Sequence, residues 1–151
     1  MAVKTELEFF RKEHVELPRF LDQWARALDL LESPEDGPRL QGLTELRELE
    51  SELLAVRGHC YSEERRLESP YGAYLKRDEA AKLAEDHREL GRQIQDMLVV
   101  LRFATIDQTE GIPARGKQLG EFIRQHLAFE EKLLRDLERS LVVEEEEKML
   151  L

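Results

Sequence analysis

Two pairs of residues in this chain have the types and the spacing of metal ligands. His59 stands four residues before Glu63, and His126 stands four residues before Glu130. In an α-helix, positions i and i+4 are neighbours on one face, so each histidine and its glutamate can point at one locus. Each pair therefore predicts part of a metal site on a helix.

The other two histidines also repeat. His14 and His87 each open the string His-x-Glu-Leu-x-Arg, and each precedes one of the His-x-x-x-Glu pairs. The chain thus contains the pattern H…HxxxE twice, and no histidine is left over. Histidines scattered through a core for packing would have no reason to repeat in this way, so the duplication favours a two-fold metal site.

Together these residues offer four imidazole nitrogens and two carboxylates. Imidazole with carboxylate suits iron, manganese or zinc, and a single cysteine argues against a sulfur-dominated site. Burying Glu63 and Glu130 without partners would cost several kcal/mol each, roughly. A pair of cations that both carboxylates can bridge removes that cost.

Apolar residues spaced by three and four predict four helices that carry these ligands. The first covers about 10–31, with a kink or restart at Pro18. It ends in a run of helix breakers at 33–38. The second begins near 41–44 and is stopped by Ser69-Pro70-Tyr71-Gly72; the third covers about 78–104. After a connection at about 105–116, the fourth carries apolar residues from Leu119 to Leu141.

Four helices of similar length with short connections predict an all-α, antiparallel up-down-up-down four-helix bundle built of two pseudo-symmetric hairpins. We expect a metal-binding domain at residues 1–143. Residues 144–151, which include four consecutive glutamates, are expected to form a solvated, frayed acidic tail.

The bulk composition narrows the class of protein. The chain has 151 residues, the length of one ordinary domain, and a formal net charge of −10. That charge argues against nucleic-acid binding, which needs clustered Lys and Arg. The sequence has no apolar run long enough to predict a membrane span or a signal peptide. Its one cysteine cannot form an intramolecular disulfide framework. We therefore expect a cytoplasmic protein.

The two H…HxxxE halves resemble the hemerythrin-like, or HHE cation-binding, domain over most of the chain. The resemblance implies a four-helix bundle around a non-haem centre of two iron ions. The terminal ligands that it implies are the four histidines: His14, His59, His87 and His126. The bridging carboxylates that it implies are Glu63 and Glu130.

The chain departs from the oxygen-carrying hemerythrins at one point. Those proteins carry an HxxxH pair on the third helix, whereas the residues four before and four after His87 are Leu83 and Gly91. Oxygen transport is therefore not favoured. The coordination of one metal ion would then be completed by water, Glu64, Glu131 or another side chain.

Neighbouring residues have simpler interpretations. Glu64 and Glu131 each lie one step round the helix from a predicted ligand, so a solvent-facing role or a hydrogen bond to a ligand is favoured over metal binding. Cys60 is expected to be a small buried apolar residue rather than a redox-active thiol.

Three classes of function fit the predicted site. The favoured class is a binding protein, rather than a dedicated enzyme, that binds or senses dioxygen or a related small ligand at two iron ions, with manganese or zinc as alternative metals. The second is an iron-handling oxidase or peroxidase-like activity. The third is a regulatory interaction domain whose fold depends on bound metal.

Overall fold

The computed structural model describes residues 8, 11–12, 14–66 and 75–150, without the side chains of residues 63–66. The described part is helical and contains no strand, which confirms the predicted all-α class. Its elements are α2 (Leu17–Leu31), α3 (Asp36–Glu48), α4 (Glu50–Arg66), α6 (Arg77–Phe103), the 3₁₀ turn η1 (Ile106–Gln108) and α7 (Ile112–Leu150).

The helix restart predicted at Pro18 is present. His14 is helical, Val15 and Glu16 form a bend, and α2 begins at Leu17. Pro18 occupies the first turn of α2, where a backbone N–H has no partner within the helix, so its missing donor does no harm. His14 consequently lies just ahead of α2 rather than within it.

The prediction of a single second helix that begins near 41–44 was wrong in two respects. The helix begins earlier, at Asp36, because Pro38 lies in its first turn, where proline is tolerated. It is also interrupted at Leu49, whose ψ of 3° departs from helical values and separates α3 from α4. The predicted stop at residues 69–72 lies outside the described residues.

The fourth helix is longer than predicted at both ends, whereas the third lies close to its predicted bounds. α6 agrees with the predicted third helix to within a residue at each end. α7 begins at Ile112, directly after Gly111, whose φ of +85° suits a glycine in the turn. The connection is therefore shorter than predicted, and Pro113 lies in the first turn of α7.

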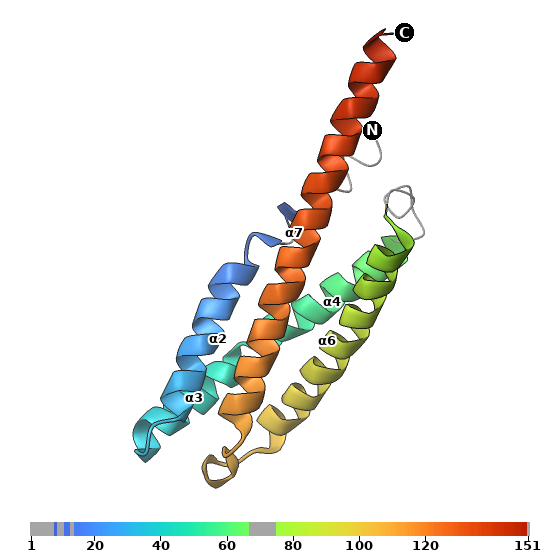
Figure 1. Ribbon diagram of the computed structural model, residues 1–151. Helices are drawn as coiled ribbons and strands as arrows, with labels where there is room; N and C mark the ends of the chain where they lie inside the picture. The colour runs from blue at the N-terminus through green and yellow to red at the C-terminus, as the bar shows by residue number, and fades with distance from the viewer. Residues whose placement is uncertain (1–7, 9–10, 13, 67–74, 151) are drawn as a thin grey trace.

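The predicted acidic tail is helical. α7 continues without interruption to Leu150, and its C-terminal part extends beyond the ends of α2, α4 and α6 (Figure 1). Residues 142–150 are all exposed, as a solvated segment should be.

The long helices pack side by side around one core (Figure 1). α2 contacts α3 and α7, and α6 contacts α4 and α7. Trp24 of α2 donates a hydrogen bond of 2.8 Å from its indole Nε1 to the carbonyl of Gly116 in α7. Eleven large side chains are fully buried: Trp24, Leu28, Leu43, Leu46, Leu53, Leu83, Leu90, Ile94, Ile112, Leu119 and Leu134.

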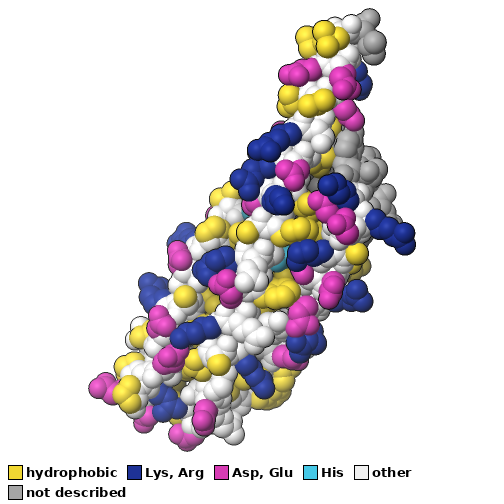
Figure 2. Space-filling model, in the orientation of Figure 1, with side chains coloured by type: hydrophobic (Ala, Val, Ile, Leu, Met, Phe, Trp, Pro, Cys, Tyr) yellow, Lys and Arg dark blue, Asp and Glu magenta, His cyan; other side chains and the backbone are white. Residues whose placement is uncertain are grey.

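The surface carries many charged side chains (Figure 2). On the face that Figure 2 shows, basic and acidic side chains are interspersed and almost no histidine is visible. Within the described part of the chain, no helix is both long and apolar enough to cross a membrane.

Candidate metal centre

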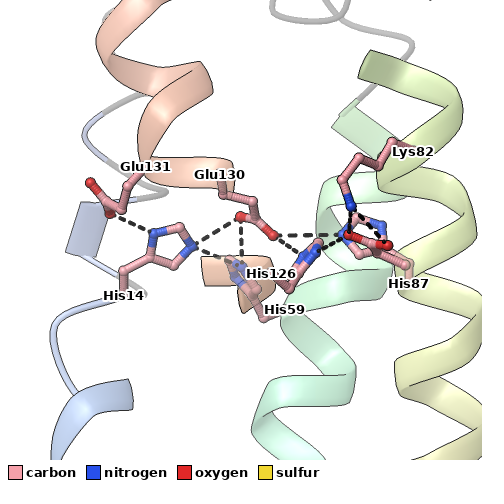
Figure 3. A network of polar contacts seen from close by, with 8 residues as sticks. His14, His59, Lys82, His87, His126, Glu130 and Glu131 are labelled. Atoms are coloured by element: carbon pink, nitrogen blue, oxygen red, sulfur yellow. Dashed lines mark hydrogen bonds and ion pairs between the residues drawn. The ribbon is translucent and has the colours of Figure 1, made fainter. Parts of the chain in front are cut away.

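All four histidines lie in the interior, and they come from four different parts of the chain. His14 precedes α2, His59 lies in α4, His87 in α6 and His126 in α7. Each is between 5% and 9% exposed. Figure 3 shows the four rings gathered around the side chain of Glu130, which is 3% exposed.

The two carboxylate oxygens of Glu130 face different pairs of histidines. Oε2 lies 3.1 Å from Nε2 of His14 and 3.4 Å from Nε2 of His59. Oε1 lies 3.8 Å from Nε2 of His87 and contacts Nε2 of His126. One carboxylate therefore stands between two pairs of imidazoles and offers one oxygen to each pair.

The two pairs have nearly the same internal geometry. The rings of His14 and His59 meet edge to face, with centroids 4.8 Å apart and planes at 68°. The rings of His87 and His126 have centroids 4.9 Å apart and planes at 72°. The duplication seen in the sequence is thus a duplication in space, with one histidine pair on each side of Glu130.

Two further carboxylates hold histidines from outside the cluster. Nδ1 of His14 donates to Oε1 of Glu131 at 3.0 Å, and Nδ1 of His126 donates to Oδ2 of Asp86 at 3.1 Å. A carboxylate only accepts, so the proton of each neutral ring lies on Nδ1 and the lone pair of Nε2 points inward.

These inward lone pairs face the negatively charged oxygens of Glu130. Such an arrangement is repulsive unless a proton or a metal ion lies between nitrogen and oxygen. Nε2 of His126 and Oε1 of Glu130 are in contact, yet neither makes a hydrogen bond of normal geometry among the described residues. Nitrogen and oxygen lone pairs that converge in this way are what a cation requires.

The pKa values of Glu130 and His14 reflect the same unfavourable contact between lone pairs. Burial alone raises the pKa of Glu130, but its close contacts with the nitrogens of the four imidazoles outweigh burial and lower this pKa well below 4.5. Burial alone lowers the pKa of His14, but the hydrogen bonds to Glu130 and Glu131 and the Glu130 charge raise it above 6.5. A proton on His14 therefore helps to balance the buried carboxylate when no metal does.

Of the six residues predicted to bind metal, the structure brings five together. The sixth, Glu63, lies in α4 one turn after His59, but its side chain is outside the described residues, as is that of Glu64. Glu131 makes a hydrogen bond to a predicted ligand, one of the two roles favoured for it.

Sequence reasoning missed two neighbours of the histidines. Asp86 directly precedes His87, and only the packing of α6 against α7 brings its carboxylate to His126. Cys60 is buried as predicted, at 4% exposed, but its sulfur lies close to the ligand nitrogens of His87 and His126.

Comparison with known protein families identifies the class. The model of the hemerythrin HHE cation-binding domain matches residues 5–137. The chain belongs to this family. No curated protein and no solved structure is significantly similar to the chain.

The matched range contains the whole histidine cluster and ends within α7. Membership in the hemerythrin HHE family implies that the chain binds cations. The donors present fit that role, because two groups of buried residues each place three ligand atoms within 4.8 Å of one another. They are His14, His59 and Glu130, and Cys60, His87 and His126.

A cavity of about 210 Å³ lies against the first group. Its wall includes His59 of α4, and most of the wall is apolar, with Phe20 and Val56 among the lining residues. Cavities of this character admit small apolar molecules. In this hemerythrin-family chain the cavity adjoins one histidine of the cluster, His59.

Proposed function

We propose that the protein binds two iron ions at the histidine cluster and uses them to bind or sense dioxygen or a related small ligand. His14 and His59 would hold one ion, and His87 and His126 the other. Glu130 would bridge the pair, and Glu63 would be the second bridge, as its spacing from His59 predicts.

The position of Glu130 carries this proposal. Each of its oxygens faces a different histidine pair, and the inward nitrogen of one ring in each pair is set by an outer carboxylate. Imidazole and carboxylate donors suit iron, with manganese and zinc as alternatives. When bound, the metal pair supplies open coordination positions and electrons for small-ligand chemistry.

The chain's own residues would control access to that chemistry. The partly open, mostly apolar cavity beside His59 provides a space next to the first pair that is large enough for a diatomic molecule. Phe20 and Val56 in its wall would favour apolar ligands. This cavity is the observation that favours small-ligand binding over a purely structural metal site.

The proposal includes the finer architecture of the bundle. We infer two helical hairpins in an antiparallel up-down-up-down order, α2 with α3–α4 and α6 with α7. The reversal of the chain between α2 and α3, and again between α6 and α7, supports this order (Figure 1). The equal ring geometry on the two sides of Glu130 supports pseudo-symmetry.

Anaerobic iron loading tests the function. Full-length protein loaded with ferrous iron should bind two ions per chain. Exposure to oxygen should produce ligand-to-iron charge-transfer absorption that shifts on addition of azide. Binding of less than one iron ion per chain would contradict the dinuclear site. Two bound ions with spectra insensitive to oxygen and azide would contradict the small-ligand role.

A further inference from the structure

The chain's single cysteine lies inside the metal centre rather than elsewhere in the core. Cys60 is 4% exposed, and its Sγ lies within 4.8 Å of ligand nitrogens of both His87 and His126. Because the three residues come from α4, α6 and α7, chain proximity alone does not account for their convergence.

The helical geometry of α4 explains why two consecutive residues reach different parts of the centre. Successive side chains on an α-helix point about 100° apart. His59 faces His14, with their Nε2 atoms 3.1 Å apart, while Cys60 faces the His87 and His126 pair. One turn of α4 thus supplies one donor to each half of the centre.

The half of the centre that contains Cys60 has a coordination set of its own. His87 and His126 contribute two nitrogens and Oε1 of Glu130 contributes one oxygen. A sulfur would make four donors among the described side chains, the number with which zinc sites are commonly closed. The other half contains two nitrogens and one oxygen among the described side chains, and no sulfur.

We propose that Cys60 is a ligand of the metal ion held by His87 and His126, so that the two metal positions differ in chemistry. This inference rests on the proposed dinuclear site. Metal binding breaks the S–H bond, passes the proton to solvent and forms one metal–sulfur bond, with no electron transferred. The soft thiolate would favour zinc or ferrous iron at this position over harder ions such as magnesium.

Cobalt(II) binding to the full-length protein under reducing, anaerobic conditions tests the assignment. Any thiolate-to-cobalt charge-transfer band must come from Cys60, because the chain has no other cysteine. We expect this band to grow with one of the two bound cobalt ions. It should be absent in Cys60→Ser and Cys60→Ala, which should bind one cobalt at least about 10-fold more weakly, a typical effect of losing metal-site support.

His14→Ala is the matched control, because it alters the half of the centre that lacks sulfur. The variant should keep the thiolate band while losing affinity for one ion. X-ray absorption of the zinc-loaded wild-type protein provides a measurement independent of any variant. We expect a sulfur neighbour at about 2.3 Å, the usual zinc–sulfur distance.

The outcomes separate this inference from the proposed function. Two cobalt ions bound without a thiolate band, together with zinc spectra lacking sulfur, would overturn the role of Cys60 and leave the dinuclear site intact. Failure to bind cobalt, zinc or iron at all would overturn both. If the Cys60 variants do not fold, the wild-type band and zinc–sulfur distance still decide the question.

Discussion

Asp86 holds His126 from outside the metal centre, with its Oδ2 3.1 Å from Nδ1 of the ring. The same oxygen lies 3.1 Å from Nζ of Lys82, so the exposed ammonium group of Lys82 holds Asp86 in place. Glu131 has the equivalent relationship with His14 on the other side of Glu130. Each histidine pair therefore has one ring whose direction and tautomer an outer carboxylate determines.

Replacing this outer carboxylate should weaken metal binding without removing a ligand. We expect Asp86→Asn to lower the affinity for one metal ion by about 10-fold to 100-fold, because the ring loses a charged partner that makes its Nε2 more basic. Competition with a chromophoric chelator measures the affinity. Asp96→Asn is the control on the same helix, since Asp96 is exposed and pairs only with Arg92 among the contacts described. Equal losses in the two variants would contradict the role of Asp86.

Removing the central carboxylate should affect both metal positions, whereas removing a histidine should affect one. We expect Glu130→Ala to abolish binding of the pair, and Glu63→Ala to do the same if it is the second bridge. His14→Ala should weaken mainly one ion and His87→Ala the other. Metal analysis after gel filtration gives the number bound, with Glu121→Ala, at an exposed position of the same helix, as the control. Small, equal effects from all of these changes would rule out bridging.

The pH dependence of the metal-free protein should follow from the Glu130 and His14 pKa values. Glu130 has a lowered folded pKa, so its stabilisation is present above 4.5 and is lost as pH falls through the folded value. His14 has a raised folded pKa, so its stabilisation is present below 6.5 and is lost as pH rises through the folded value. We expect maximal apo-protein stability between these limits.

Thermal melts of chelator-treated protein across the pH range measure this profile. Glu130→Gln should flatten it on both sides, because the amide cannot ionise and leaves His14 with only one of its two charged partners, Glu131. A wild-type profile that Glu130→Gln leaves unchanged would mean that other groups determine the pH dependence.

Two glycines should respond oppositely to alanine. A Cβ at Gly91 would meet no atom within 4 Å, so Gly91→Ala should stabilise α6 by roughly 0.5–1 kcal/mol through helix propensity. A Cβ at Gly42 would lie 2.7 Å from the carbonyl oxygen of Ala27 and 2.8 Å from the nitrogen of Leu31. Gly42→Ala should therefore destabilise by about 1–3 kcal/mol, the usual cost of overpacking. Urea unfolding of both variants checks the signs; the same sign for both would refute the packing of α2 on α3.

Filling the cavity beside His59 should slow access of small ligands. We expect Val56→Phe to reduce the rate of azide binding to the iron-loaded protein by about 10-fold, equivalent to roughly 1.4 kcal/mol in the barrier. Stopped-flow absorption measures the rate. Val99→Phe, at an exposed position of α6, should leave the rate unchanged. An unaltered rate in Val56→Phe would show that ligands reach the centre by another path.

The sequence was sufficient to predict the helical class, the restart at Pro18 and the histidines that lie together, because all of these depend on spacing along the chain. It was insufficient where neighbours come from other helices. Asp86 reaches His126, and Cys60 approaches His87, only because α6 packs against α7 and α4. The break at Leu49 is also invisible in the apolar pattern, since Leu49 remains buried and keeps its place in the stripe.

The bend at Val15 and Glu16 predicts that the two halves of the centre bind their metal ions at different stages of loading. His87 and His126 are fixed within long helices, whereas His14 stands ahead of α2 and is tied to the cluster by its contacts with Glu130 and Glu131. A preorganised pair binds with less loss of conformational entropy. We therefore expect the centre to load in order, first between α6 and α7 and then at His14. Two different metals added one after the other would then give a single heterometallic species rather than a mixture.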